Sequence, residues 1–272
     1  MTGYVLALDD AAVQRFLLAG RLAEGAERTK WAAVGIAPGA RVADIGCGPG
    51  AIATLLASLV APGGTVLGID SDRTALAAAS QLAKAAGVAN VEFREGNAAS
   101  TGLPRASLDV VMVRHVLGHN GGRETDIVSH LVSLLRPGGS LYLVDVDLTG
   151  LRIYPQDPDL TDMYRRYFDF HAGLGNDISA GLRLPDLIRQ AGLELTDFDG
   201  RYDRFREKGF RGPPWEARAA LAAAGLAGPE DLARWAKAFE RLDREQEPPS
   251  LFLPVFIATG RRGRAQASAD MA

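Results

Sequence analysis

The chain is poor in cysteine, histidine and aromatic residues, and it has no excess of charge of one sign. Its single cysteine, Cys47, rules out a disulfide within the chain and a zinc site built from several thiolates. The formal net charge is −3, whereas proteins that bind nucleic-acid phosphates carry a clustered basic face. We therefore predict no nucleic-acid partner. We predict no metal either, because no His, Asp and Glu residues show the spacing of metal ligands.

Long hydrophobic runs and a targeting segment are also missing. No window approaches the stretch of about 18 apolar residues that spans a membrane. The short apolar start lacks a basic region and is interrupted by Asp9 and Asp10, so it does not resemble a signal peptide. These features predict a cytoplasmic protein without membrane insertion. We expect the protein to be a monomer or a homodimer.

From residue 41 onward, short apolar runs alternate with helical patterns. The runs are rich in Val, Leu and Ile and are continuous, which is typical of parallel strands buried on both faces. Strand–helix alternation at this spacing predicts an α/β fold with a doubly wound sheet. The first five predicted strands are 41–45, 65–69, 91–95, 108–113 and 140–146, and the helices between them include 50–59, 72–86 and 124–135.

The regular alternation stops after Asp147, and the pattern divides the chain into four regions. Further helices are predicted at 160–173, 184–191, 214–224 and 229–247, and further strands at 193–205 and 251–260. The predicted regions are an N-terminal helical lid (1–35), a cofactor-binding core (36–147), a substrate-side insertion with a helical cap and closing strands (148–260), and a disordered tail (261–272).

A glycine-rich loop follows the first predicted strand and opens a helix. The segment reads Asp44-Ile45-Gly46-Cys47-Gly48-Pro49-Gly50. Glycines let a ligand approach the backbone closely, and open α/β sheets bind ligands at this position. Asp70 ends the second predicted strand, where an acid can accept hydrogen bonds from a ribose diol.

This arrangement fits either a dinucleotide or S-adenosylmethionine, and two residues distinguish them. Asp44 places a carboxylate where a pyrophosphate would meet like charge. Pro49 lacks the N–H that a phosphate-binding loop would use. A ligand with an ammonium and a sulfonium group suits an acidic loop better, so the residues favour S-adenosylmethionine over NAD(P).

These motifs resemble those of the class I S-adenosylmethionine-dependent methyltransferases. The similarity covers the glycine loop, Val66-Leu67-Gly68-Ile69-Asp70, Glu95-Gly96-Asn97-Ala98 and Leu134-Leu135-Arg136-Pro137-Gly138-Gly139. Arg114-His115-Val116-Leu117-Gly118-His119 is similar to a segment of the small-molecule group that includes quinone C-methyltransferases. The resemblance implies a Rossmann-like sheet of seven mostly parallel strands, with an antiparallel last strand and helical lid elements.

The resemblance also implies roles for individual residues in binding S-adenosylmethionine. The methionine end would lie along the glycine loop, the ribose at the end of the second strand and the adenine after the third strand. A further residue would lie near the methionyl carboxylate or the mouth of the substrate site. Asp44, Gly46 and Gly48 would lie along the methionine end, and Asp70 and Ser71 would lie at the ribose. Asn97 and Ala98 would flank the adenine, and Arg114 would be the residue near the methionyl carboxylate or the substrate mouth.

Three of the four histidines are candidates for contact with the acceptor. His115 and His119 follow the fourth predicted strand, and His171 lies in the aromatic-rich region after the fifth. A general base adds roughly 10²–10⁴-fold to the rate when the acceptor must lose a proton. His130 lies in a helical pattern and is interpreted as a structural residue.

The sequence therefore predicts a methyltransferase that acts on a quinone-like acceptor or a secondary metabolite. The aromatic residues outside the core would wall an apolar acceptor pocket; they are Tyr154, Tyr164, Phe168, Phe205, Phe210 and Trp215. Two alternatives stay open: an enzyme with this cofactor fold that performs other chemistry, and a ligand-binding protein without catalysis. A nicotinamide-dependent oxidoreductase is a further alternative, disfavoured by the loop.

Overall fold

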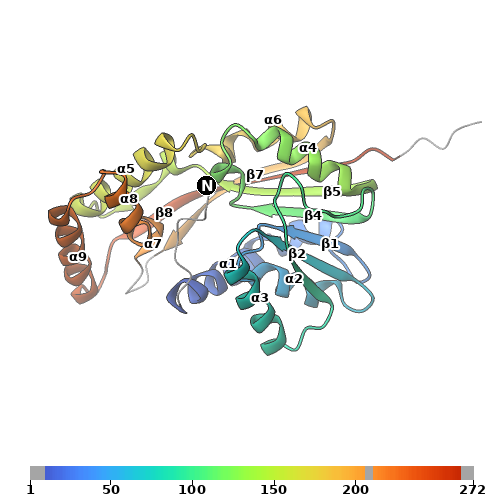
Figure 1. Ribbon diagram of the computed structural model, residues 1–272, viewed down its shortest axis with the longest axis horizontal. Coiled ribbons are helices and arrows are strands. Elements are labelled where there is room, and N and C mark those ends of the chain that lie inside the picture. The colour runs from blue at the N-terminus through green and yellow to red at the C-terminus, as the bar shows by residue number, and fades with distance from the viewer. Residues whose placement is uncertain (1–9, 206–210, 265–272) are drawn as a thin grey trace, which may run out of the picture.

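A single mixed sheet organises the chain, and the computed structural model describes residues 10–205 and 211–264 (Figure 1). Within these residues eight strands run in the order β3-β2-β1-β4-β5-β8-β6, and β7 also pairs with β8. β1 to β5 are parallel, and β8 is antiparallel to β5, β6 and β7. The strands are β1 (Arg41–Ile45), β2 (Thr65–Asp70), β3 (Val91–Glu95), β4 (Leu108–Arg114), β5 (Leu135–Val146), β6 (Arg152–Tyr154), β7 (Glu194–Phe205) and β8 (Ser250–Arg261).

Helices cover both faces of the sheet, as a doubly wound fold requires (Figure 1). On β4, Val111 and Val113 pack into one hydrophobic core and Val110 and Met112 into the other, because alternate strand residues point to opposite faces. The helices on one face are α1 (Asp10–Ala33), α2 (Ala51–Val60) and α3 (Arg73–Ala85); those on the other are α4 (Glu124–Leu134) and α6 (Ala180–Gln190). The predicted fold class is confirmed, with the short strand β6 in addition.

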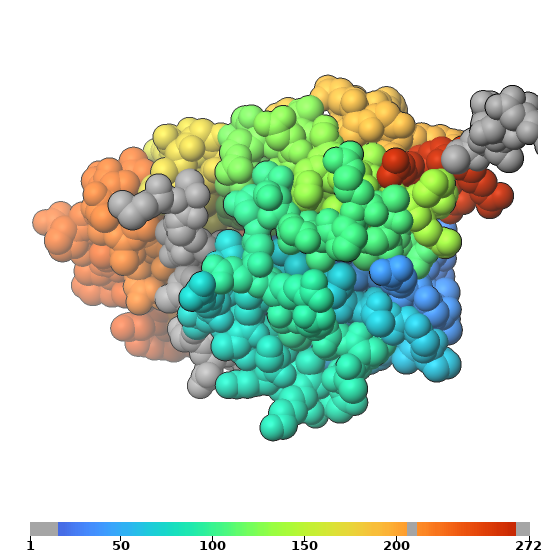
Figure 2. All heavy atoms as spheres, turned by 45° about the vertical axis from the view of Figure 1, so that its right-hand side comes forward, coloured from blue at the N-terminus to red at the C-terminus, as the bar shows by residue number. Residues whose placement is uncertain are grey.

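The remaining helices form a cap with a hydrophobic core of its own. Figure 2 shows the last of these segments, in orange, at one end of the molecule, opposite the red residues at the end of the described chain. The helices are α5 (Pro158–Gly173), α7 (Gly212–Glu216), α8 (Arg218–Ala223) and α9 (Pro229–Arg244). Buried side chains of this third core include Met163, Tyr164, Phe170, Leu221, Trp235 and Phe239.

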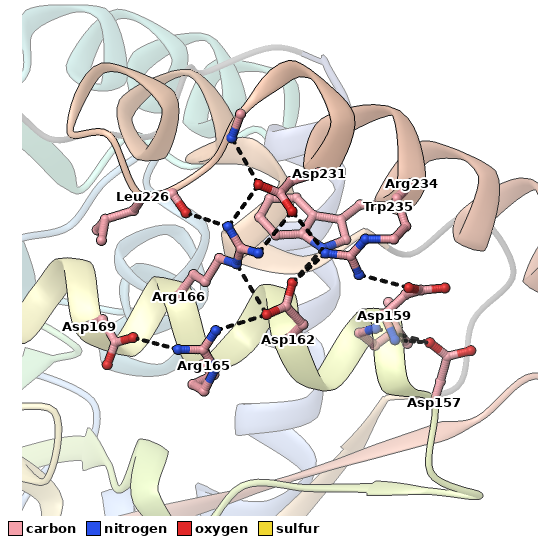
Figure 3. Close-up of polar contacts among 12 residues, drawn as sticks. Asp157, Asp159, Asp162, Arg165, Arg166, Asp169, Leu226, Asp231, Arg234 and Trp235 are labelled. Atoms are coloured by element: carbon pink, nitrogen blue, oxygen red, sulfur yellow. Dashed lines mark hydrogen bonds and ion pairs between the residues drawn. The ribbon is translucent and has the colours of Figure 1, made fainter.

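Ion pairs join α5 to α9 across the cap (Figure 3). Arg166 donates to both carboxylate oxygens of Asp231, each over 2.8 Å. Arg234 reaches back from α9 to Asp159 and Asp162 on α5. Planar guanidinium groups suit such forked contacts with carboxylates. The network therefore holds α5, which carries His171, against the rest of the cap.

Several of the predicted aromatic pocket walls belong to this cap core instead. Tyr164, Phe168, Phe205 and Trp215 pack in or against the third hydrophobic cluster, and Tyr154 is 75% exposed. Their aromatic rings stabilise the cap by removing apolar area from water. Phe210 lies outside the described residues, as does 265–272 of the predicted tail.

Element boundaries differ from the sequence prediction in a few places. The Pro137-Gly138-Gly139 turn falls inside β5, where the pairing with β4 shifts register between Leu108 and Val110. The predicted helix 214–224 is divided into α7 and α8, and α9 ends at Arg244 rather than at residue 247. The four predicted regions remain a prediction. Over the described ranges, none of the helices is both long and apolar enough to cross a bilayer.

Candidate cofactor and acceptor site

The loop between β1 and α2 depends on glycine at two positions where a side chain would collide. Gly46 and Gly50 have φ angles of 73° and 79°, which only glycine adopts without strain. A Cβ on Gly46 would lie 2.3 Å from Cγ2 of Val116, and one on Gly50 would lie 2.7 Å from Cβ of Ala79. The glycine loop therefore lies directly against the segment that follows β4.

Asp70, at the end of β2, holds the loop in place. Its Oδ2 accepts the N–H of Gly48 at 2.8 Å, and its Oδ1 accepts the N–H of Asp72 at 2.9 Å. The N–H groups of Gly46 and Cys47 both donate to the carbonyl of Ile69, over 2.7 and 3.1 Å. The end of β2 thus sets the loop conformation, and the Asp70 carboxylate lies beside it.

Asp44 is a buried carboxylate at the end of β1, with 2% of its surface exposed. Its Oδ2 has no hydrogen-bond partner among the described residues. Burial raises the pKa of Asp44 to about 7; the Arg114 charge opposes this rise and the Asp70 charge adds to it. A buried oxygen of this kind is expected to be satisfied by a bound donor. An ammonium group fits Asp44, and a phosphate does not.

The residues predicted for ribose and adenine lie next to Asp70 along the same edge. Ser71 is exposed directly after β2. The N–H of Gly96 donates to the carbonyl of Asp70 over 2.9 Å and so ties the turn after β3 to β2. In that turn the amide oxygen of Asn97 accepts a backbone N–H two residues on, and Ala98 packs against the core.

The predicted cofactor or substrate contact Arg114 is held by an acid from α1 that sequence reasoning did not single out. Its guanidinium donates to both oxygens of Glu27, over 2.5 and 3.2 Å. Arg201 of β7 and the hydroxyl of Tyr142 also donate to Glu27, over 2.8 and 2.9 Å. Burial acts to raise the pKa of Glu27, but the two guanidinium groups outweigh it and lower that pKa.

A sequence signal for Glu27 does exist. Ala23, Glu27 and Trp31 are spaced four apart, so they share one face of α1, and all three are buried. An acid on a buried helical face implies a cationic partner elsewhere in the chain. The sequence does not identify that partner. The predicted contact of Arg114 with cofactor or substrate remains a prediction.

The structure brings two of the three candidate histidines together. The ring centroids of His119, on the 3₁₀ turn η1 (Leu117–His119), and His171, at the end of α5, lie 5.2 Å apart. Tyr167 packs edge-on against His171 at 4.4 Å. His115 directly follows β4 and donates its N–H to the carbonyl of Val144. His115 and His119 are exposed, whereas His171 is buried.

The protein surroundings favour the neutral form of all three imidazole rings. Burial lowers the pKa of His171 to about 4. The ring of His119 is open to solvent on one side, but the protein atoms packed around it desolvate the ring and lower its pKa as well. His115 also lies at the surface with protein atoms around its ring. Desolvation by these atoms is the main cause that lowers the pKa of His115, and the charge of Arg114 lowers it further. Neutral imidazole has one nitrogen that can accept a proton.

Two other residues noted in the sequence have structural roles. Nε2 of His130 accepts the N–H of Thr101 over 3.1 Å. Cys47 is buried, and burial raises the pKa of its thiol, so Cys47 is not an activated nucleophile. Among residues 10–205 and 211–264, no cluster of three or more His, Cys, Asp or Glu has the arrangement of a metal site.

The fold and the site define a class of protein. An antiparallel strand β8 beside β5, a glycine loop after β1 and an acid after β2 form the cofactor-binding core of the class I S-adenosylmethionine-dependent methyltransferases. The family of methyltransferase domains matches residues 36–170. The chain belongs to this class, as the sequence resemblance predicted, and S-adenosylmethionine is the cofactor of the class.

Comparison with known proteins places the chain among varied relatives. The demethylmenaquinone methyltransferase of Lactococcus lactis is 26% identical over 63% of this chain and 66% of its own length. The arsenite methyltransferase of Aquipseudomonas alcaligenes is 36% identical over 40% of this chain and 33% of its own length. The chain thus spans between one third and two thirds of these curated relatives.

A solved structure with the same fold has a different activity in its name. The [4+2]-cyclase SpnF is 21% identical, with a TM-score of 0.56 over 91% of this chain and 82% of that chain. At this identity the likeness concerns the fold alone. Fold similarity therefore does not by itself decide the reaction.

Proposed function

We propose that this chain transfers the methyl group of S-adenosylmethionine to a small-molecule acceptor, either quinone-like or a secondary metabolite. The unpartnered oxygen of the buried Asp44 carboxylate carries this proposal, because it matches the ammonium group of the methionine end. Asp70 would hold the ribose diol, with Ser71 beside it, and Asn97 and Ala98 would flank the adenine.

S-adenosylmethionine supplies a methyl group already activated by a sulfonium, so the chain mainly has to align the acceptor and exclude water. Alignment alone can provide on the order of 7–11 kcal/mol. His115 and His119 follow β4 and His171 lies at the end of α5, and in this proposal they would face the acceptor. The names of the relatives point to different acceptors, demethylmenaquinone in one case and arsenite in another. A site of several thiols for arsenite is excluded, because Cys47 is the chain's only cysteine.

Calorimetric titration with S-adenosylhomocysteine, alongside NADH and NADPH, tests the cofactor assignment. We expect micromolar binding of the adenosyl ligand and none of the nicotinamides, because Asp44 and Pro49 disfavour a pyrophosphate. Transfer of label from tritiated S-adenosylmethionine to extracted small molecules then tests the reaction. Tight cofactor binding without any label transfer would favour the non-methylating or ligand-binding alternatives.

The binding of S-adenosylhomocysteine is expected to depend on pH through Asp44. The pKa of this carboxyl lies at about 7, and the ligand's ammonium prefers the ionised form. Lowering the pH from about 8 to about 6 protonates Asp44 and should weaken binding by roughly tenfold. Calorimetry across this range measures the change. The Asp44→Asn variant should bind weakly with no such slope, and an equally flat profile in the unaltered chain would contradict the assignment.

A further inference from the structure

Strand β7 has a long free edge. Over the described residues it pairs only with β8, and it is 12 residues long without a proline. Strand β3, at the opposite edge of the sheet, has only five residues and carries an exposed ion pair between Glu92 and Arg94. A short, charged edge resists pairing with another chain, whereas a long unprotected edge is a template for it.

The backbone of β7 shows which residues face this edge. The N–H of Gly200 donates to the carboxylate of Asp199 over 2.8 Å, and therefore not to β8. Backbone groups alternate in direction along a strand, so those of Phe198 and Tyr202 point the same way as those of Gly200. Gly200 itself is exposed. The middle of β7 thus presents a row of backbone groups that β8 does not use.

One face of β7 carries exposed aromatic side chains. Phe198 and Tyr202 are 44% and 57% exposed. The ring of Phe198 stacks on Phe256 of β8, with centroids 5.9 Å apart. Gly200 lies between the two aromatic residues and leaves room for Phe256, because a Cβ on Gly200 would lie 2.8 Å from a ring carbon of Phe256. Two exposed rings therefore flank a residue without a side chain.

The other face of β7 carries charges of both signs. Asp199 pairs with Lys30 over 3.1 Å, and its side chain is still 54% exposed. Arg201 uses Nη2 for Glu27 and Nε for Asp203. Within the part of the chain that the structure describes, Nη1 of Arg201 has no acceptor. A guanidinium group has five N–H donors, so Arg201 can bind a further carboxylate.

We propose that two copies of this chain associate through their β7 strands, which pair antiparallel about a two-fold axis at Gly200. Phe198 lies opposite the partner's Tyr202, and Asp199 lies opposite the partner's Arg201. Because the contact is symmetric, each pair forms twice. The N–H of Gly200 donates to the carbonyl of the partner's Gly200, which releases the Asp199 oxygen for the arginine. This inference does not depend on the proposed methyl transfer.

The charge pattern selects this register over its neighbours. An axis at Asp199 or at Arg201 would set that residue against its own counterpart, and like charges directly opposite each other are destabilising. In the proposed register, Asp197 lies opposite the partner's Asp203. Both acids are already paired with cations of their own chain, Asp197 with Lys30 and Asp203 with Arg201. Aromatic and opposite-charge pairs across the strands both stabilise a sheet.

Sedimentation equilibrium over a wide range of protein concentration tests the proposal. We expect the unaltered chain to form a concentration-dependent dimer. Tyr202→Lys should raise the dimer dissociation constant by at least roughly tenfold, because it removes the aromatic pair and places lysine on the edge, twice in each dimer. The melting temperature of the dilute, monomeric chain should stay unchanged. Tyr154→Lys is the matched control: Tyr154 is 75% exposed on β6, and its replacement should leave the dimer intact.

Cross-linking tests the register independently. The chain's only cysteine, Cys47, is buried, so introduced thiols can be linked selectively. In the F198C/Y202C double variant each new thiol lies opposite the other position of the partner, and a short bis-maleimide should give a covalent dimer. Either single variant should give far less, because equivalent positions lie on opposite sides of the axis.

Three results would overturn the proposal. The first is a monomer at every concentration. The second is a dimer that Tyr202→Lys does not weaken, which would place the interface on another surface. The third is cross-linking of a single variant as efficient as that of the double variant, which would show a different register. None of these results bears on the cofactor or on methyl transfer.

Discussion

Replacement of Asp70 by alanine is expected to weaken S-adenosylhomocysteine binding by at least about 100-fold. Hydrogen bonds to a charged group are worth about 1.5–3 kcal/mol each, and a ribose diol would donate two of them to Asp70. The substitution also removes the acceptor of the Gly48 N–H, so the loop loses a contact that shapes it. Calorimetric titration measures the loss of affinity.

Asp72→Ala is the matched control for this effect. Asp72 caps α3 by accepting the N–H groups of Thr74 and Ala75, over 2.8 and 3.4 Å. Loss of such a cap costs about 1 kcal/mol of stability, and the affinity for the cofactor should not change. Similar affinities in the Asp70 and Asp72 variants would show that Asp70 does not hold the ribose.

The second large effect is expected from Glu27→Ala, as a loss of about 3–5 kcal/mol in the free energy of unfolding. The carboxylate is fully buried, and its removal leaves the mostly buried Arg114 without its carboxylate partner, whereas Arg201 keeps its ion pair with Asp203. Urea unfolding at neutral pH measures the loss. Glu24→Ala on the same helix removes only an exposed pair with Arg28, worth less than about 1 kcal/mol.

Acid provides an independent check on Glu27. Because its pKa is lowered in the folded chain, the stability it contributes is present above the unfolded carboxyl's pKa of 4.5 and is lost as the pH falls through the lower folded value. The Glu27→Ala variant should therefore lose less stability than the unaltered chain over this acid range. Equal losses would show that other carboxyl groups dominate.

Much of the cofactor half of the site was predictable because it is local in sequence. A strand, a glycine loop and a helix are contiguous, so the residues 44–50 that line the loop are set by neighbouring backbone. Asp70 ends β2, which pairs in parallel with β1, and the carboxyl ends of parallel neighbours meet at one edge. Positive φ at Gly46 follows from the same local geometry.

The acceptor half depends on contacts that no local pattern encodes. The aromatic residues after β5 look alike in sequence, yet Tyr164 is buried in the cap core while Tyr167 packs against His171. Helical spacing places both on α5, but only the packing of α9 against that helix decides which way each one faces. Phe210, also predicted for the pocket, lies outside the described residues.

The sequence by itself determined the doubly wound sheet, the glycine loop with Asp44 and Asp70, and the class of cofactor, because these depend on hydrophobic periodicity and on short-range backbone conformation. Only the tertiary structure decided that Glu27 binds Arg114 and Arg201, and that His171 meets His119. Those pairings join elements far apart along the chain. The packing of η1 against the loop after α5, at Gly118 and Gly121, accompanies the histidine contact, and residue patterns do not record it.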